Sequence, residues 1–510
     1  MTRVHSVAQV RQAEEALMAR LPDGALMERA SSGLAATCAA LLDDVGPGVG
    51  RARIALLIGS GNNGGDALYA GALLARRGAK VSAVTLSDRV HEGGRVALLA
   101  AGGRIVEGAD TLAASSLLVD ADLVLDGIVG IGGAGSLRPI AAELVRSAVE
   151  GGALLVAVDI PSGVDADTGA VADPDATVDA DVTVTFGCLK PGLLLSPGRA
   201  LAGAVVVVDI GLEDVLPPAS IQVLDGDGIA DGVPEPGEDD YKYSRGVVGI
   251  AAGSAKYRGA ALMATGSARL GGAGMVHILD RGDGVAALVI DHFWDVVTSS
   301  DSPRSVPRVT AWGVGPGLGQ EIADRGTLLA VLSADTPVLV DADGLRMVTQ
   351  PECHAALERR RAAGLPTLLT PHEGEFAALG YDCGSGSSED RLGAALRAAR
   401  DLHAVVLLKG PGTVVASPSG TAYIDTRGGP ELGTAGSGDV LTGLLASMLA
   451  SAAARDALDD DAVARIAAAG VALHGIAGTL AGEGGRPVTA PDIIGALPQA
   501  IGDARRGRLP

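Results

Sequence analysis

The stretch Gly433-Thr434-Ala435-Gly436-Ser437-Gly438-Asp439, followed by Val440-Leu441-Thr442-Gly443-Leu444-Leu445, predicts a glycine-rich bend that opens directly into an apolar helix. Glycines let backbone N–H groups turn towards one point, and the start of a helix adds partial positive charge there. Such a point suits a phosphoryl group in transfer, and Asp439 could accept the proton of the attacking hydroxyl. Taken alone, the pattern also describes an ordinary helix start with Asp439 as a first-turn charge.

The whole chain has the size and composition of a multidomain globular protein. Its 510 residues are 47% hydrophobic and 20% charged, which predicts two or three folded domains. The net charge of −21 argues against a nucleic acid or an anionic membrane surface as partner. The four cysteines form no C-x-x-C pair, and no uninterrupted apolar run is long enough to cross a bilayer. We therefore expect a cytoplasmic protein without a disulfide framework and without a membrane span.

The first half of the chain repeats the order strand, glycine loop, helix. A β-rich run over 53–58 ends in Gly59-Ser60-Gly61-Asn62-Asn63-Gly64-Gly65-Asp66, and a helix over 67–77 and a second strand over 80–86 follow. Later strands end at Asp126, at Asp159 and shortly before Lys190. Because the carboxyl ends of parallel strands share one edge of a sheet, these side chains predict a ligand site there. Each aspartate alone could equally cap a loop.

Residues 1–224 resemble the NAD(P)H-hydrate epimerase family in the motifs GNNGGD (61–66) and DIPSG (159–163) and in the Lys190-Pro191-Gly192 turn. The resemblance implies a Rossmann-like three-layer fold that interconverts the R and S forms of hydrated NADH and NADPH, abbreviated NAD(P)HX. It implies Asp159 and Lys190 as the acid/base pair, which suits proton transfer at a carbinolamine. The implied potassium ligands are Asn63, Asp126 and Ser162. The implied substrate contacts are Asn62, Asn63, Gly64, Gly65, Asp66, Gly130, Ile131, Gly132, Gly133, Ala134, Gly135, Ser136 and Asp159.

Residues 225–240 are rich in Asp, Glu, Gly and Pro and show no periodicity, which predicts an exposed linker between two domains. Beyond this segment, buried strands again alternate with helices over 241–510. Glycine turns and polar residues follow the strands, as at Gly315-Pro316-Gly317 and Asp341-Ala342-Asp343. Two short strands around residues 414–424 predict a hairpin.

The second half resembles the ribokinase-like superfamily and, more closely, the NAD(P)H-hydrate dehydratase family. The motifs GPGLG (315–319), DADGL (341–345), TPHEGEF (370–376), KGPGT (409–413) and GTAGSGD (433–439) carry the resemblance. It implies a three-layer α/β/α domain that uses ADP, with Mg²⁺, to dehydrate S-NAD(P)HX. Asp439 would be catalytic, and Glu373 or Glu375 could position the metal through water. The implied NAD(P)HX contacts are Ala260, Gly317, His372 and Asp439, and the implied ADP contacts are Lys409, Gly410, Pro411, Gly412, Thr413, Ala435, Gly436, Ser437 and Gly438.

Two other functions share parts of these patterns. A vitamin-precursor or sugar kinase also carries G-x-G-D, but it would release a phosphorylated product. A non-catalytic scaffold resembling Rossmann-like modules of RNA-decay complexes would not need Asp159 and Lys190, and the acidic chain disfavours RNA. His372 after Pro371 could also serve only as a helix cap. The interpretation as a two-step repair enzyme, expected to be a homo-oligomer acting on NAD(P)HX and ADP, accounts for both halves together.

Overall fold

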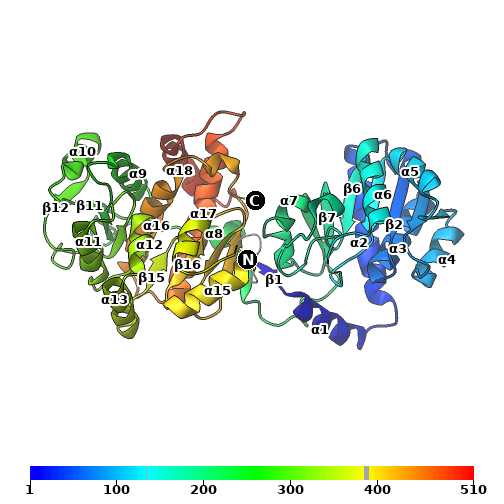
Figure 1. Cartoon of the computed structure of the whole chain (residues 1–510), viewed down its shortest axis with the longest axis horizontal. Helices are drawn as coiled ribbons and strands as arrows, with labels where there is room; N and C mark the ends of the chain where they lie inside the picture. The colour runs from blue at the N-terminus through cyan, green and yellow to red at the C-terminus, as the bar shows by residue number, and fades with distance from the viewer. Residues whose placement is uncertain (134, 384–389, 510) are drawn as a thin grey trace. The chain divides into compact units, whose positions relative to one another are not determined.

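The computed structural model describes residues 1–133, 135–383 and 390–509. The chain forms two compact units, Arg3–Ala219 and Ser220–Pro510, and the second also includes Met1 and Thr2. Each unit is built on its own β-sheet, with helices on both faces (Figure 1). The expected α/β class, with a Rossmann-like unit followed by a second α/β unit, is confirmed.

The unit Arg3–Ala219 contains a parallel sheet of seven strands in the order β4-β3-β2-β5-β6-β7-β8. This order corresponds to the doubly wound pattern, in which the chain reverses direction across the sheet between β2 and β5. Apolar side chains of α2 and α3 cover one face, and those of α5 and α6 cover the other. The strands are β2 (Arg53–Ile58), β3 (Lys80–Thr85), β4 (Arg104–Glu107), β5 (Leu123–Gly127), β6 (Leu154–Val158), β7 (Val182–Phe186) and β8 (Ala204–Val208); the helices are α1 (Val7–Met18), α2 (Ala25–Asp44), α3 (Asn62–Arg76), α4 (Glu92–Ala100), α5 (Thr111–Val119), α6 (Pro139–Gly151) and α7 (Gly198–Leu201).

The second unit contains a mixed sheet of eleven strands in the order β1-β9-β18-β17-β16-β15-β14-β13-β10-β11-β12. The run from β12 to β16 is parallel, and β16, β17 and β18 pair antiparallel, which confirms the hairpin near residues 414–424. The strands are β1 (Thr2–Val4), β9 (Ile221–Val223), β10 (Val247–Ala251), β11 (Met275–Leu279), β12 (Val297–Ser299), β13 (Ala311–Val314), β14 (Val338–Val340), β15 (Thr367–Leu369), β16 (Val405–Leu408), β17 (Thr413–Ala416) and β18 (Ala422–Asp425).

The helices of the second unit lie on both faces of its sheet (Figure 1). Residues of α9, α16, α17 and α18 form one large core with β10 and β13. The helices are α8 (Gly226–Asp231), α9 (Arg258–Ala268), α10 (Val285–His292), α11 (Ile322–Leu332), α12 (Asp343–Val348), α13 (Pro351–Ala362), α14 (Glu373–Ala378), α15 (Arg391–Leu402), α16 (Ser437–Ala453), α17 (Asp460–Ala481) and α18 (Ala490–Arg505).

The boundary between the units differs from the expected one at residue 224, and most of 225–233 is not an exposed linker. Asp225 accepts a hydrogen bond from Gly228 N and caps the short helix α8. Leu224, Ile229 and Val233 are buried in the core of the second unit. The acidic composition of the segment obscured these three apolar residues in and around α8, and only residues 235–239 are continuously exposed.

One helix among the described residues, α17, is long and apolar enough to cross a membrane by length and composition. Arg465 and His474 interrupt its apolar residues, so α17 passes this test without being the uninterrupted apolar run that the sequence analysis excluded. Moreover, 78% of its most apolar window is buried inside the protein, as is typical of a core helix. Its small residues pack closely against α16 and α18.

Candidate functional site

The carboxyl edge of the first sheet brings Asp159 and Lys190 into direct contact. Asp159 follows β6, Lys190 lies just beyond β7, and these two strands are neighbours. Lys190 Nζ lies 2.6 Å from Asp159 Oδ1 and also donates to Thr185 Oγ1 (2.8 Å) and Phe186 O (2.9 Å). The Lys190 side chain is almost fully buried, and the hydrogen bonds that Asp159 accepts from the described residues all go to its Oδ1, which leaves Oδ2 open to a ligand. The pair can therefore hold and move a proton at Asp159.

Asp159 also has a left-handed backbone, with φ of +67°, which is uncommon for a non-glycine residue. Such backbone strain persists where the surrounding structure fixes it, often at functional sites. A cavity of about 530 Å³ opens at this carboxylate, and it is lined by Glu14, Asn62, Asn63, Asp66 and Asp159 among others. Asp159 and Lys190 thus lie at a space of the size that small ligands occupy.

Two further carboxyl groups of this cavity have raised pKa values. Burial raises the pKa of Asp66 well above its ordinary value, and the charges of Asp159 and Glu14 add to the effect. Burial also raises the pKa of Glu14, again with a contribution from Asp159. A raised pKa shifts each of these carboxyl groups towards its protonated form, and a protonated carboxyl group can donate a hydrogen bond to a ligand.

The three residues predicted to bind potassium lie around the loop that follows β5: Asn63, Asp126 and Ser162. Asp126 is completely buried and accepts hydrogen bonds from Ser162 N (2.8 Å) and Ser162 Oγ (2.7 Å). Burial raises the pKa of Asp126 to about 6, and these hydrogen bonds limit the rise. Asn63 Oδ1 approaches Gly130, while its buried Nδ2 has no hydrogen-bond partner. Carboxylate, hydroxyl and amide oxygens are the ligands that hard cations prefer, so this donor set fits a potassium ion.

The predicted substrate contacts of the first unit gather at the same edge. Residues Asn62 to Asp66 form the first turns of α3 rather than the predicted loop, because the helix starts directly after Gly61. No side chain caps this helix start, so its backbone N–H groups remain available to an anion. Gly130, Ile131 and Gly132 line the same cavity as Asp159, whereas Gly133, Gly135 and Ser136 line a larger neighbouring cavity. Ala134 lies outside the described residues.

In the second unit, Asp439 lies in the first turn of α16, as the opening motif predicts. Gly436 precedes the helix with φ of +90°, and no side chain caps the helix start. Burial raises the pKa of Asp439 to about 7; the charge of Asp341 adds to this, and that of Lys409 opposes it. A carboxylate that titrates near neutral pH beside free amide groups can accept a proton during phosphoryl transfer.

Lys409 connects the strand ends with the start of α16. Its Nζ lies 2.7 Å from Asp341 Oδ1 and 3.7 Å from Glu375 Oε2, while Thr442 of α16 donates to Asp341 Oδ2 at 2.7 Å. Burial alone would lower the pKa of Lys409, but the charges of Asp341 and Glu375 raise it overall. A Cβ added at Gly438 would lie 3.5 Å from Lys409 Nζ. The predicted ADP segments 409–413 and 435–438 therefore meet at one point.

The Lys409–Thr413 turn is held in place by Arg391, which the sequence analysis did not single out. Arg391 donates to Leu408 O, Lys409 O and Gly412 O, and it pairs with Glu373 at 2.5 Å. Glu375 likewise accepts a hydrogen bond from His372 N at 2.9 Å. Both glutamates that could position a metal thus have protein partners. Among the described residues, no group of three or more His, Cys, Asp and Glu side chains forms a metal cage.

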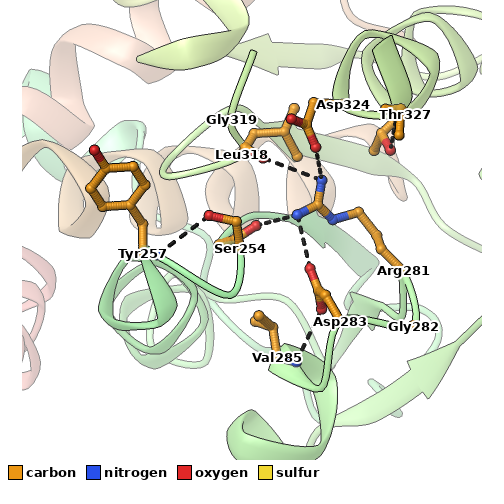
Figure 2. A network of polar contacts seen from close by, with 12 residues as sticks. Ser254, Tyr257, Arg281, Gly282, Asp283, Val285, Leu318, Gly319, Asp324 and Thr327 are labelled. Atoms are coloured by element: carbon orange, nitrogen blue, oxygen red, sulfur yellow. Dashed lines mark hydrogen bonds and ion pairs between the residues drawn. The ribbon is translucent and has the colours of Figure 1, made fainter. Parts of the chain in front are cut away.

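Gly317 and Ala260 are neighbours, because a Cβ added at Gly317 would lie 2.8 Å from that of Ala260. Arg281 braces the Gly317 turn by donating to Leu318 O, Asp324 Oδ1 and Gly253 O (Figure 2). His372 caps α14 through Nδ1, as the alternative interpretation of this residue predicts, and its ring is half exposed. The backbone of His372 also forms a parallel β-bridge with Lys409. The predicted NAD(P)HX contacts therefore lie near the carboxyl ends of the central strands. Ala260, Gly317 and His372 come after β10, β13 and β15, and Asp439 lies near Asp341 and Lys409 at the ends of β14 and β16.

The comparisons with known proteins match both halves of the chain. Residues 23–192 match the family model of the YjeF-related protein N-terminus, and residues 248–499 match the one described as NAD(P)H-hydrate dehydratase. The bifunctional NAD(P)H-hydrate repair enzyme Nnr of Mycobacterium leprae is 42% identical over 88% of this chain and 90% of its own length. The protein of the same name from Corynebacterium glutamicum is 34% identical over 98% of both chains.

Among solved structures, the ADP/ATP-dependent NAD(P)H-hydrate dehydratase of Bacillus subtilis, co-crystallised with ATP and Mg²⁺, is 27% identical to this chain. It covers 55% of this chain and 98% of its own length, with a TM-score of 0.47. A yeast structure matches 37% of this chain at 23% identity, with a TM-score of 0.33. The sequence relatives, which match 88% and 98% of this chain, therefore carry the family assignment.

Proposed function

The chain belongs to the family of bifunctional NAD(P)H-hydrate repair enzymes, and from this premise we propose how its two units return hydrated NADH and NADPH to the intact cofactors. The first unit interconverts the R and S forms of NAD(P)HX, which differ at C6 of the nicotinamide ring. The second unit dehydrates the S form with ADP and releases NAD(P)H, AMP and phosphate.

The observation that carries the dehydratase assignment is the environment of Asp439. Hydroxide is a poor leaving group, but a phosphate ester at the same carbon leaves readily. In the proposed step, Asp439 accepts the proton of the C6 hydroxyl group. The hydroxyl oxygen attacks the β-phosphoryl group of ADP, and AMP departs. The C6–O bond of this phosphate ester then breaks and phosphate leaves. Loss of a proton from C5 restores the dihydropyridine ring. The raised pKa of Asp439, about 7, suits this base.

The backbone around Asp439 supports binding of the transferred phosphoryl group. The amides of Gly436, Ser437 and Gly438 open the helix α16, and no side chain of the motif occupies them. Lys409 adds a positive charge within reach of the same point. We propose that Lys409–Thr413 and Ala435–Gly438 hold ADP, while Ala260, Gly317 and His372 contact NAD(P)HX. Mg²⁺, when bound, would screen the nucleotide phosphates, and it would be held mainly by them.

In the first unit, we assign the proton transfer to Asp159 with Lys190 as its buried partner. The pair can take the proton of the C6 hydroxyl while the C6–N1 bond breaks and N1 gains a proton, which gives an open-chain aldehyde. The reverse steps close the ring on either face of this aldehyde and give the R or the S form. Asn62–Asp66 and the loop from Gly130 to Ser136 would contact the substrate. Asn63, Asp126 and Ser162 would hold a potassium ion, whose charge would compensate the buried carboxylate of Asp126.

The proposed enzyme acts in the cytoplasm on free dinucleotides and ADP, without a nucleic acid or a membrane partner. The acidic net charge of −21 agrees with this choice of partners. We also propose that it forms a homo-oligomer, and light scattering of the full chain tests this: a mass of one chain would contradict it.

The assay of absorbance at 340 nm after addition of racemic NADHX tests the function directly. With ADP, the full-length protein should recover all of the NADH and release equal amounts of AMP and phosphate. Substitution of ATP for ADP tests the nucleotide preference, and chromatography of the nucleotides identifies the products. A stable phosphorylated product without NADH would favour the sugar or vitamin kinase instead.

A further inference from the structure

A second cavity of the first unit adjoins the one that contains Asp159, and the steps above assign no role to its lining residues near the ends of β3 and β4. It measures about 1540 Å³ and extends along the carboxyl edge of the sheet, past the ends of β2, β3 and β4 to the start of α6. It shares Ser60, Ile128, Val129 and Gly130 with the smaller cavity that contains Asp159. The two cavities therefore adjoin at the point where the strand order reverses.

The strand order indicates which part of a dinucleotide each cavity takes. In doubly wound sheets, a dinucleotide lies across the reversal point with one nucleotide over each half of the sheet. The reacting nicotinamide ring must lie near Asp159, at the end of β6, which belongs to one half. The adenosine half then falls on the other side of the reversal point, over β2, β3 and β4, where the larger cavity lies.

The loop that follows β3 forms one wall of this larger cavity and carries Ser87, Asp88 and Arg89. Asp88 and Arg89 are exposed, and neither side chain has a hydrogen-bond or ion-pair partner among residues 1–133, 135–383 and 390–509. By contrast, Arg95 on the same cavity is tied to Glu92 by two hydrogen bonds of 2.9 and 2.7 Å. The loop therefore presents one carboxylate and one guanidinium that are both available to a ligand.

We propose that this loop reads the 2′ position of the adenosine ribose, so that Asp88 accepts hydrogen bonds from the ribose hydroxyls of NADHX and Arg89 pairs with the 2′-phosphate of NADPHX. The end of the second strand is where doubly wound folds place a carboxylate for a ribose 2′-hydroxyl or an arginine for a 2′-phosphate. An arginine presents a planar fork of donors that matches phosphate oxygens. Both residue types are present here, which accounts for acceptance of both substrates by one unit.

The proposal rests on the epimerase function proposed above, and its test separates the two. The full chain and the variants Arg89→Gln and Asp88→Asn are compared, with Arg77→Gln as a matched control. Arg77 lies at the C-terminal end of α3, away from both cavities. Interconversion of R and S forms is followed by chromatography without ADP, so that the dehydratase cannot act.

Arg89→Gln should raise KM for NADPHX about tenfold, the loss expected for one charge-assisted hydrogen bond, and change KM for NADHX less than about twofold. Asp88→Asn should raise KM for NADHX more than KM for NADPHX, and Arg77→Gln should change neither. Equal changes for both substrates, or none, in Arg89→Gln would overturn the proposal. A wild-type protein without interconversion would instead overturn the epimerase function.

A binding experiment tests the role of Asp88 and Arg89 even if the wild-type protein does not interconvert the epimers. Isothermal titration of the full chain with adenosine 2′,5′-bisphosphate should show a site whose Kd rises about tenfold in Arg89→Gln, while titration with ADP stays unchanged. Arg77→Gln should match the wild type for both ligands. Identical isotherms of wild type and Arg89→Gln with adenosine 2′,5′-bisphosphate would refute the role of this loop.

Discussion

Replacement of Asp341 by Asn should lower the pKa of Asp439 and move the pH dependence of dehydration towards acid. Burial is the main cause of the raised pKa of Asp439, and the nearby charge of Asp341 is the next. Asn keeps the shape of Asp341 and can still bond Lys409 and Thr442. It removes the repulsive charge but leaves Lys409 in place, so the pKa of Asp439 should fall by about one unit.

The sign follows from the role of Asp439 as a base, which must be ionised to act. Activity is therefore present above the pKa of Asp439 and is lost as the pH falls through it. At about pH 6, a group with a pKa of about 7 is roughly 10% ionised, whereas one with a pKa of about 6 is roughly 50% ionised. Relative to its own plateau at alkaline pH, Asp341→Asn should thus be about five times more active than the wild type at about pH 6.

The assay is the initial rate of NADH formation from S-NADHX with saturating ADP across the pH range. Asp335→Asn serves as a control, because Asp335 is exposed and pairs with Arg304. It should leave the profile unchanged. A profile of Asp341→Asn that coincides with the wild type, or that moves towards alkali, would refute this account of how Asp439 is tuned.

Three other predictions follow from the geometry. Asp159→Asn should let ADP-driven turnover consume only the S fraction of racemic NADHX rapidly, and rapid complete turnover at 340 nm would exclude its catalytic role. Potassium should raise the melting temperature of the wild type more than sodium does, and Asp126→Asn should abolish that difference in calorimetry. Gly317→Ala should weaken dehydratase activity, because the φ of Gly317 is +57° and the new Cβ would crowd Ala260. The control Gly326→Ala should leave dehydratase activity unchanged, because a Cβ at this position of α11 meets open space.

Local sequence patterns were sufficient to predict the strand ends and the start of α16. Asp126, Asp159 and Lys190 each follow an apolar β-rich run, and the parallel arrangement of such runs brings their ends together. The glycines before Asp439 predicted the uncapped helix start that the structure contains. These features depend on few neighbouring residues, so a linear pattern can reveal them.

Contacts between distant segments could not be predicted in the same way. Glu14 comes from α1 and reaches the cavity of Asp159 only because α1 folds back onto the sheet. Asp341 follows β14 and Lys409 follows β16, so their side chains meet across the end of β15 although 68 positions separate them in the chain. Arg391, from α15, holds the turn that follows β16. The helical start at Asn62 was also missed, because glycines at 64 and 65 weaken helix propensity and only packing overcomes it.

The most direct test of the central claim, that Asp439 makes the hydroxyl of NAD(P)HX a phosphoryl acceptor, is the Asp439→Asn variant. It is measured at 340 nm with racemic NADHX and ADP, and the R and S forms are separated by chromatography. The account predicts no recovery of NADH and no AMP, while the two epimers still interconvert at the wild-type rate. Full recovery of NADH by Asp439→Asn would contradict it.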